Sequence, residues 1–319
     1  MAILITGVAG FIGSNLANTF INTGKIVFGI DNLCRGSIDN LINLPKEKFL
    51  FDNVDLSNYD NYEISIFNFL QNERIEEVWH FAANSDIQAG IFDPEIDFRD
   101  TFLTTYNTLR IMKKFEIQKI FFASSSAVYG DMGNDLIHEY SGPLLPVSNY
   151  GAMKLSSESI ISAASESLPI SGYIFRFPNV VGGPATHGII LDLVRKLKKT
   201  PYELNVLGDG TQQKAYLHVD ELIDAMLYIR NYAVDKLNYY NIGTDDGGVS
   251  VRFIAEKIVE LFSPVAQIVF GLGNKGWVGD VPKFKYSIEK VKALGWSPKL
   301  NSSEAIVKAI KEIIKQETE

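Results

Sequence analysis

The first thirteen residues constrain the fold more than any other stretch of the chain. Residues 2–6 read Ala-Ile-Leu-Ile-Thr, an apolar run that predicts a short buried strand. The glycine pattern Gly7-x-x-Gly10-x-x-Gly13 follows at once, and apolar residues then recur with helical spacing at Ile12, Leu16 and Phe20. Strand, glycine turn and helix in this order suit a phosphate-binding loop, because glycines let the backbone approach a pyrophosphate and the helix N-terminus offers N–H groups. A tight turn without a ligand would use the same glycines, so other residues must decide.

An acidic residue at the end of the second expected strand supports the ligand-binding alternative. Residues 25–30 predict that strand, and Asp31 follows it, 18 positions after Gly13. An acid about 20 residues past the glycines can reach the ribose hydroxyls of a bound adenosine. Because a carboxylate repels a 2′-phosphate, Asp31 favours NAD over NADP as the cofactor, although Arg35 nearby weakens that preference.

The alternation of strands and helices predicts the fold class. Further strands are expected at residues 49–54, 77–81, 119–124 and 170–175, with helices around residues 59–70 and 96–115. Such alternation implies an α/β fold of the Rossmann type, a doubly wound parallel sheet with helices on both faces. The composition changes after Pro178. We therefore expect an NAD-binding domain over residues 1–178, with returning segments near 215–245, and a smaller C-terminal α/β substrate lobe over residues 179–319.

A tyrosine and a lysine four residues apart are the candidates for chemistry. On a helix, Tyr150 and Lys154 would share one face, and the ammonium would lower the phenol pKa from its ordinary value of about 10. Tyr150 could then act as a general base towards a sugar hydroxyl, with Ser125 as its partner. Ser148 or Asn149 would cap this helix. In a chain with 14 tyrosines the spacing alone is weak, and a half-buried Tyr beside a solvated Lys is the alternative.

Composition excludes several other classes of function. The formal net charge of −8 disfavours a nucleic-acid partner, which would require a basic face. Cys34 is the single cysteine of the sequence, so an internal disulfide is impossible and a reducing, cytoplasmic compartment is expected. The sequence contains no apolar run of the roughly 18 residues that a membrane span needs. The four histidines lack the spacing of metal ligands, and no metal is expected.

Taken together, the motifs resemble one known family. They are Gly7-x-x-Gly10-x-x-Gly13, Asp31, Asp55-Leu56, Phe81-Ala82-Ala83, Ser125-Ser126-Ala127-Val128-Tyr129-Gly130, Tyr150-x-x-x-Lys154, Arg176-Phe177-Pro178-Asn179 and Tyr216-Leu217-His218-Val219-Asp220. This set, which spans nearly the whole chain, resembles the extended short-chain dehydrogenase/reductase family, and within it the NAD-dependent epimerases and dehydratases of the UDP-glucose 4-epimerase type.

The resemblance implies a role for each matching residue. Ser125, Tyr150 and Lys154 would be catalytic, with Lys154 also holding the nicotinamide ribose. The expected cofactor-binding residues are Gly7, Gly10, Phe11, Ile12, Gly13, Asp31, Asn32, Asp55, Leu56, Phe81, Ala82, Ala83, Tyr150, Lys154 and Phe177. The expected substrate-binding residues are Ser85, Ser125, Ser126, Asn179, Ile189, Ile190, Lys214 and Asp280.

The two residues after Ser125 indicate the reaction within this family. Dehydratases and decarboxylases of the family carry acids there, whereas this chain has Ser126 and Ala127. The resemblance therefore implies 4-epimerisation of a UDP-hexose, UDP-N-acetylhexosamine or UDP-hexuronate through a transient 4-keto sugar. The alternative is another enzyme of the family: a reductase, a decarboxylase, a 4,6-dehydratase, or an epimerase at another carbon or on a CDP- or GDP-sugar.

The chain departs from the family pattern at three positions. Lys214 and Trp277 stand where arginines are usual, and Thr101 replaces the usual Asn of the fourth crossover helix. These replacements concern substrate binding and cofactor orientation more than hydride transfer.

A homodimer is also expected from the resemblance. It would pack helices at residues 97–115 and 150–165 against their mates, and Phe102, Tyr106 and Leu109 form an apolar strip for that contact or for the core.

Overall fold

The computed structural model describes residues 1–133, 135–273 and 285–318. The chain forms two units. Unit 1 comprises Met1–Gly130, Gly142–Arg176 and Arg230–Tyr240. Unit 2 comprises Asp131–Ser141, Phe177–Ile229 and Asn241–Glu319. Within the described ranges, no helix combines the length and the apolar character that a membrane crossing needs.

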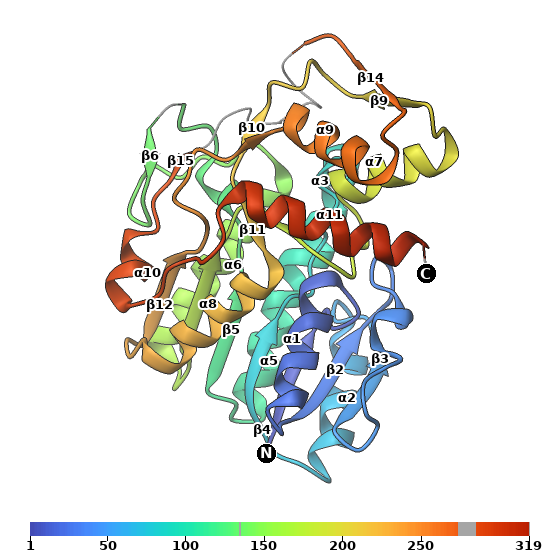
Figure 1. The fold of residues 1–319 in the computed structure, drawn as a ribbon. Helices are drawn as coiled ribbons and strands as arrows, with labels where there is room; N and C mark the ends of the chain where they lie inside the picture. The colour runs from blue at the N-terminus through green and yellow to red at the C-terminus, as the bar shows by residue number, and fades with distance from the viewer. Residues whose placement is uncertain (134, 274–284, 319) are drawn as a thin grey trace. The chain divides into compact units, whose positions relative to one another are not determined.

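Unit 1 is built on a seven-stranded sheet in the order β12-β7-β5-β4-β1-β2-β3 (Figure 1). Its strands are β1 (Ala2–Thr6), β2 (Ile26–Asp31), β3 (Phe49–Asn53), β4 (Ile75–His80), β5 (Lys119–Ala123), β7 (Ser171–Arg176) and β12 (Leu237–Asn241). The pairings from β3 across to β7 are parallel. The chain winds outward in both directions from β1, so the order reverses between β1 and β4. This switch point is where ligands bind on such sheets, outside the strands' carboxyl ends.

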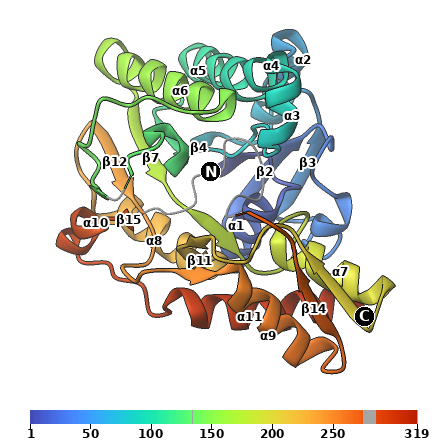
Figure 2. The same ribbon diagram turned by 90° about the horizontal axis from the view of Figure 1, so that it is seen from above.

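Helices cover both faces of this sheet, which confirms the predicted doubly wound fold. In Figure 2, α2, α5 and α6 lie on one side of the sheet and α1 on the other. The bounds are α1 (Phe11–Asn22), α2 (Tyr59–Leu70), α5 (Thr104–Lys114) and α6 (Asn149–Ser167). Fully buried side chains from the strands, such as Ile3, Trp79 and Phe121, fill the core, with the rings of Trp79 and Phe121 stacked 4.2 Å apart.

The single helix expected over residues 96–115 is wrong in detail. The structure divides it into α4 (Pro94–Asp97), a π-helical segment η2 (Phe98–Leu103) and α5. Thr104 donates its hydroxyl proton towards the carbonyls of Asp100 and Thr101, 2.9 and 3.0 Å away. Such side-chain bonding to backbone carbonyls disturbs the regular helical ladder. A π-helical turn also often marks a functional site.

Unit 2 consists of short strand pairs and five helices among its described residues. The pairs are β6 (Leu136–Ile137) with β15 (Lys285–Tyr286), β8 (Asn179–Val181) with β11 (Tyr216–His218), β9 (Glu203–Val206) with β14 (Gln267–Phe270), and β10 (Gln213–Lys214) with β13 (Val249–Ser250). The helices are α7 (Ile189–Lys199), α8 (Val219–Tyr232), α9 (Val251–Phe262), α10 (Glu289–Leu294) and α11 (Ser302–Thr318). Unit 1 also contains three short helical elements: η1 (Ile38–Leu41), α3 (Ile87–Phe92) and η3 (Ser126–Tyr129).

The last helix begins with the expected reciprocal cap. The backbone N–H of Asn301 donates to the Glu304 carboxylate, and the N–H of Glu304 donates to the Asn301 side chain, each over 3.0 Å. One face of α11 is buried in the core of unit 2 through Ile306, Ile310 and Ile313. The capping pattern and the apolar spacing therefore predicted this helix correctly.

Candidate active site

The glycine turn after β1 is packed too closely for side chains. Gly7 has φ +71°, and a Cβ atom there would lie 2.7 Å from the backbone N of Ala82. A Cβ on Gly13 would lie 2.3 Å from the carbonyl oxygen of Gly7. Gly10 precedes α1 without a side-chain cap, so the N–H groups of the first turn remain available to an anion. The turn therefore has the close-packed, donor-rich form that a pyrophosphate requires.

Asp31 has a second role that the sequence did not reveal. Its carboxylate accepts hydrogen bonds from the backbone N–H of Ala9 (2.9 Å) and of Leu33 (2.8 Å). Burial raises the pKa of Asp31, and the two N–H donors act in the opposite direction. Asp31 thus ties the glycine turn to the end of β2. Arg35 pairs with Asp86 (3.1 Å), so the cation that could have favoured a 2′-phosphate already has an anionic partner.

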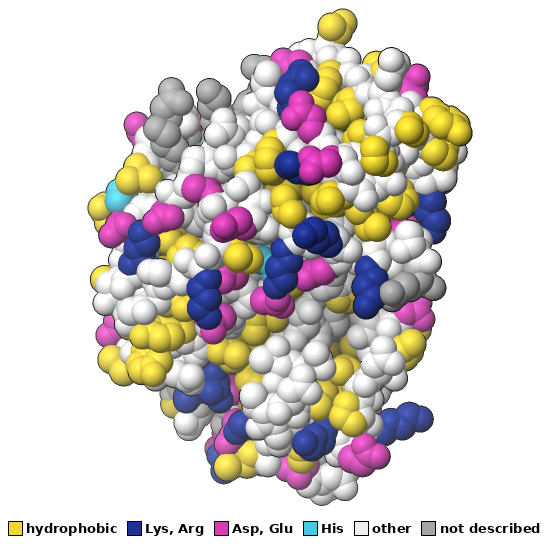
Figure 3. Space-filling view, in the orientation of Figure 1, with side chains coloured by type: hydrophobic (Ala, Val, Ile, Leu, Met, Phe, Trp, Pro, Cys, Tyr) yellow, Lys and Arg dark blue, Asp and Glu magenta, His cyan; other side chains and the backbone are white. Residues whose placement is uncertain are grey.

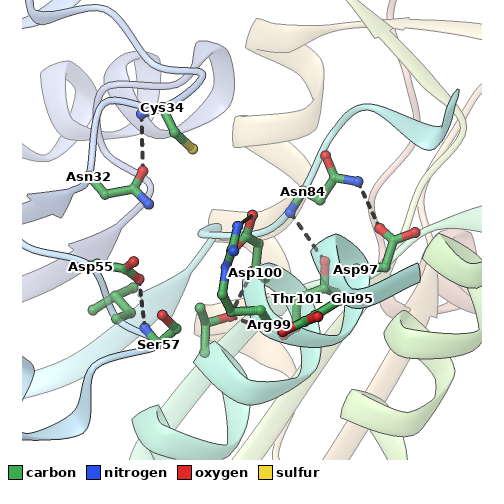
Figure 4. A network of polar contacts seen from close by, with 12 residues as sticks. Asn32, Cys34, Asp55, Ser57, Asn84, Glu95, Asp97, Arg99, Asp100 and Thr101 are labelled. Atoms are coloured by element: carbon green, nitrogen blue, oxygen red, sulfur yellow. Dashed lines mark hydrogen bonds and ion pairs between the residues drawn. The ribbon is translucent and has the colours of Figure 1, made fainter. Parts of the chain in front are cut away.

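More acids surround this edge of the sheet than the sequence analysis identified. Figure 4 shows Asn32 and Asp55, which follow β2 and β3, together with Arg99 and Asp100 of the π-helical segment. Arg99 is bound to Asp100 at 2.7 Å. Asp55 accepts from the N–H of Ser57 (2.9 Å). Carboxylates therefore outnumber the cationic side chain among these residues.

Thr101 and Asn84 connect the same segment to the end of β4. The backbone N–H of Asn84 donates to the Thr101 hydroxyl (3.2 Å), and the Asn84 amide donates to Asp97 (2.8 Å), as Figure 4 shows. All three residues are buried. Thr101, predicted only as a departure from the family pattern, therefore fixes the backbone beyond β4.

The three predicted catalytic side chains come together in unit 1. Ser148 caps α6 by accepting from the N–H of Gly151 (3.1 Å), as expected. Tyr150 and Lys154 then lie one turn apart, with the Lys154 Nζ 5.8 Å from the centre of the Tyr150 ring. Ser125 lies close enough to Tyr150 for its hydroxyl to lower the pKa of the phenol. A hydroxyl, a phenol and an ammonium therefore converge beyond the carboxyl end of β5.

The expected fall in the Tyr150 pKa does not occur in this arrangement. Burial raises the pKa of Tyr150 to about 12, although the nearby Ser125 hydroxyl acts in the opposite direction. Burial also lowers the pKa of Lys154 to about 7, against the charges of Glu158 and Asp97, which raise it. The Lys154 Nζ donates to the carbonyl oxygen of Ala123 (2.6 Å), not to the phenol. Desolvation thus outweighs the neighbouring cation that the sequence suggested.

A buried ion pair that sequence reasoning missed lies behind these groups. Glu158, one turn after Lys154 on α6, binds Arg176 at the end of β7 over 2.6 Å. Ser124 donates its hydroxyl proton to the same carboxylate, and Arg176 donates to the Tyr129 hydroxyl (2.9 Å). The spacing of four residues from Lys154 was the signal that could have identified Glu158.

The predicted substrate-binding residues are divided between the units. Ser85 is exposed and Ser126 is half-buried, and both belong to unit 1. Unit 2 contains Asn179, Ile189, Ile190 and Lys214, together with Phe177, which was predicted to bind the cofactor. The Ile190 side chain packs in the core of unit 2, so only its backbone could meet a ligand. The predicted positions Asp280 and Trp277 lie outside the described residues.

A cluster of titratable groups in unit 2 has the spacing of metal ligands. His218 lies between Glu312 (3.0 Å) and Asp220 (3.3 Å). Lys308 is 2.5 Å from Asp220, so cationic side chains already balance both acids. Figure 3 shows Lys or Arg and Asp or Glu side chains interspersed over the face on which α11 lies. The cluster is therefore an ion network that connects α11 to β11.

A hydroxyl, a phenol and an ammonium beyond the carboxyl end of β5, on a sheet of the dinucleotide-binding type, define an enzyme of the extended short-chain dehydrogenase/reductase class. Residues 3–243 match the model of the NAD dependent epimerase/dehydratase family. The chain belongs to that family, as the motifs predicted, and NAD is its cofactor. The close-packed glycine turn, the uncapped start of α1 and the acid at the end of β2 fit that dinucleotide.

Similarity to known proteins extends along the whole chain. A Methanocaldococcus jannaschii protein, provisionally named a UDP-glucose 4-epimerase, is 32% identical over 315 residues, with 97% of each chain covered. The UDP-glucuronate 4-epimerase of Thermodesulfobacterium geofontis is 26% identical, covering 96% of this chain and 94% of its own. The structure of Thermus thermophilus UDP-glucose 4-epimerase in complex with NAD superposes with a TM-score of 0.85 at 25% identity, covering 98% of this chain and 99% of that one.

Proposed function

We propose that the protein is an NAD-dependent 4-epimerase of a UDP-sugar that works through a transient 4-keto sugar. The observation that carries the proposal is the convergence of Ser125, Tyr150 and Lys154 beyond β5, with no acid at the two positions after Ser125. The names of the relatives support a UDP-linked hexose or hexuronate as the substrate. They do not distinguish between those sugars, and a UDP-N-acetylhexosamine is a further candidate.

The residues of the site have complementary tasks in this reaction. Tyr150 accepts the proton of the C4 hydroxyl and later returns it, while Ser125 hydrogen-bonds that oxygen and orients it. Lys154 holds the nicotinamide ribose, and its positive charge favours the phenolate. When bound, NAD supplies the hydride acceptor, which is restored within each cycle. The hydride returns to the opposite face of C4 and the proton returns to the C4 oxygen, so no net oxidation occurs.

The second candidate is another nucleotide-sugar reaction of the same class. Loss of water or of CO2 from an oxidised sugar requires additional acid–base groups. Ser126 and Ala127 offer none at the two positions where the family's dehydratases and decarboxylases carry acids. These two residue types therefore support simple epimerisation.

The test is turnover of separate UDP-sugars in D2O, followed by NMR. We expect UDP-glucose, UDP-N-acetylglucosamine or UDP-glucuronate to give its C4 epimer with the C4 hydrogen retained and no net change in NADH absorbance. Tyr150→Phe should abolish this turnover. Deuterium at C3 or C5, release of water or CO2, or net use of NADPH would replace the proposal with one of the alternatives.

We also propose that the enzyme is a homodimer in a reducing, cytoplasmic compartment. Phe98 and Tyr106 are each 48% exposed along the η2–α5 face, whereas Leu109 is buried and belongs to the core. The apolar strip for a partner is therefore Phe98, Phe102 and Tyr106. Sedimentation of the wild type should give twice the monomer mass, and Tyr106→Glu should shift it towards the monomer. A monomeric wild type at micromolar concentration would overturn the dimer.

A further inference from the structure

The ion pair between Glu158 and Arg176 joins three elements that carry the candidate chemistry. Glu158 lies on α6, and Arg176 is the last residue of β7. The Arg176 Nε and Nη2 atoms donate to the carboxylate over 2.9 and 2.6 Å, and both residues are at most 6% exposed. Ser124, just after β5, donates its hydroxyl proton to the same carboxylate. One buried anion is therefore shared by a helix and two strand ends.

The Glu158 carboxylate binds a residue that is adjacent in sequence to the candidate catalytic Ser125. Ser124 immediately precedes Ser125, and its backbone N–H is fixed by the Phe175 carbonyl (2.8 Å). On α6, Tyr150, Lys154 and Glu158 follow each other at spacings of four residues, so they share one face. Displacing the carboxylate would move Ser125 relative to the face that carries Tyr150 and Lys154.

Stability alone gives a weak reason for such a pair. Burying two charges costs desolvation that their attraction only partly offsets, so apolar residues often serve equally well. Unit 1 contains a second pair of the same chemistry, between the buried Glu77 on β4 and the half-buried Arg230, with Nη2 to Oε1 at 2.6 Å. The described contacts of Glu77 involve none of the catalytic side chains. Comparing variants of Glu158 and Glu77 can therefore distinguish an effect on the alignment of the catalytic side chains from an effect on the stability of the fold.

We propose that Glu158 is a positioning residue that holds Ser125 against the Tyr150–Lys154 face and keeps Lys154 cationic. The proposal rests on the epimerase function above. The titratable groups that act on Lys154 from the packed elements are Glu158 of α6, Asp97 of α4 and His80 of β4. Burial lowers the pKa of His80 to about 3, so it stays neutral, and burial raises the pKa of Asp97. Of the two carboxylates, Glu158 acts more strongly on Lys154, and its ion pair with Arg176 fixes its position.

The experiment compares Glu158→Gln with Glu77→Gln in the NAD-loaded enzyme. Two quantities are measured: the pH profile of kcat, and the titration of the Lys154 ¹³Cε NMR signal, which is assigned by its loss in Lys154→Arg. In Glu158→Gln we expect a fall in kcat of at least about tenfold with little change in KM. The Lys154 midpoint and the alkaline limb of kcat should move down by roughly one pH unit. Glu158→Asp should bring both back towards the wild type.

The control decides between positioning and stability. Glu77→Gln should lose a comparable amount of thermal stability yet keep the wild-type profile and Lys154 midpoint. If Glu158→Gln behaves in the same way, the proposal is overturned. If Glu158→Gln does not fold, Ser124→Ala tests the same link, and an unchanged kcat there overturns it.

Failure of the epimerase assignment would be visible separately. In that case the wild type would turn over no UDP-sugar, while the NMR titration of Lys154 in Glu158→Gln would still report whether the carboxylate controls the ammonium.

Discussion

The ammonium of Lys154 lies 5.8 Å from the centre of the Tyr150 ring and donates its proton to the Ala123 carbonyl. The lysine is therefore anchored to the end of β5, one helical turn from the phenol. Because burial raises the pKa of Tyr150 to about 12, the phenol is a proton donor in this arrangement. For the proposed work as a base, the pKa of Tyr150 must fall, which requires positive charge near the phenol.

Replacing the phenol tests this arrangement most directly. Tyr150→Phe should lower kcat by about a thousandfold, because general acid–base catalysis of one proton transfer contributes roughly 10²–10⁴. NAD binding, followed by fluorescence titration, should change little. Tyr140→Phe, at a tyrosine that is 80% exposed in unit 2, serves as the control and should retain full activity. Comparable turnover by the two variants would remove Tyr150 from the mechanism.

Asp31 should affect NAD binding through the shape of the glycine turn as well as through the ribose. Asp31→Asn exchanges one acceptor of the Ala9 and Leu33 N–H groups for an amide donor, so NAD affinity should fall by about tenfold. The variant should still reject NADP, because Asp55 and Asp100 remain. Calorimetric titration with both dinucleotides checks this. Tight NADP binding by Asp31→Asn would show that Asp31 alone sets the preference.

Gly13 should tolerate no side chain. In Gly13→Ala the new methyl group would lie 2.3 Å from the Gly7 carbonyl oxygen, so the turn must shift. We expect the free energy of unfolding to fall by about 1–3 kcal/mol and NAD binding to weaken with it. Gly247→Ala is the control, since its methyl group would meet an atom only at 3.5 Å. Urea denaturation with and without NAD measures both effects, and equal behaviour of the two variants would contradict the packing argument.

His80 should make the protein sensitive to mild acid. Burial lowers its pKa to about 3, while its ring is hydrogen-bonded by Thr6 (2.7 Å) and Thr105 (3.1 Å). Below a pH of about 6.5, His80 is protonated in the unfolded chain but remains neutral in the folded chain. The contribution of His80 to the free energy of unfolding is therefore fully present above that pH and is lost as the pH falls towards 3. The loss is about 1.4 kcal/mol per pH unit, or about 2 kcal/mol between pH 6.5 and 5.

Urea denaturation at about pH 7.5 and about pH 5 measures this dependence. In His80→Asn, the change in the free energy of unfolding between the two pH values should be smaller by about 2 kcal/mol. His138→Asn should leave the difference in place. A difference that is unaffected by His80→Asn would mean that other groups dominate acid unfolding.

The local chemistry of the chain was sufficient to predict the framework. The alternation of apolar strands and amphipathic helices indicated the doubly wound sheet, because periodicity along the chain determines which face of each element is buried. Gly7 and Asp31 indicated the cofactor because turn geometry and spacing are short-range properties. The helix caps at Ser148 and Asn301 could also be predicted from the sequence, since a capping side chain forms its hydrogen bond within its own helical turn.

Only the tertiary structure decided how the site is tuned. Whether Tyr150 gains or loses basicity depends on the balance between burial and a nearby charge, and burial is a property of the packed chain. Glu158 binds Arg176 and Ser124, which are 18 and 34 positions away in the sequence. A pattern of neighbouring residues does not predict contacts over such separations. The sequence thus determined the scaffold and the candidate catalytic groups through local preferences. Their protonation and alignment were determined by desolvation and by contacts between distant segments, which exist only once the chain has folded.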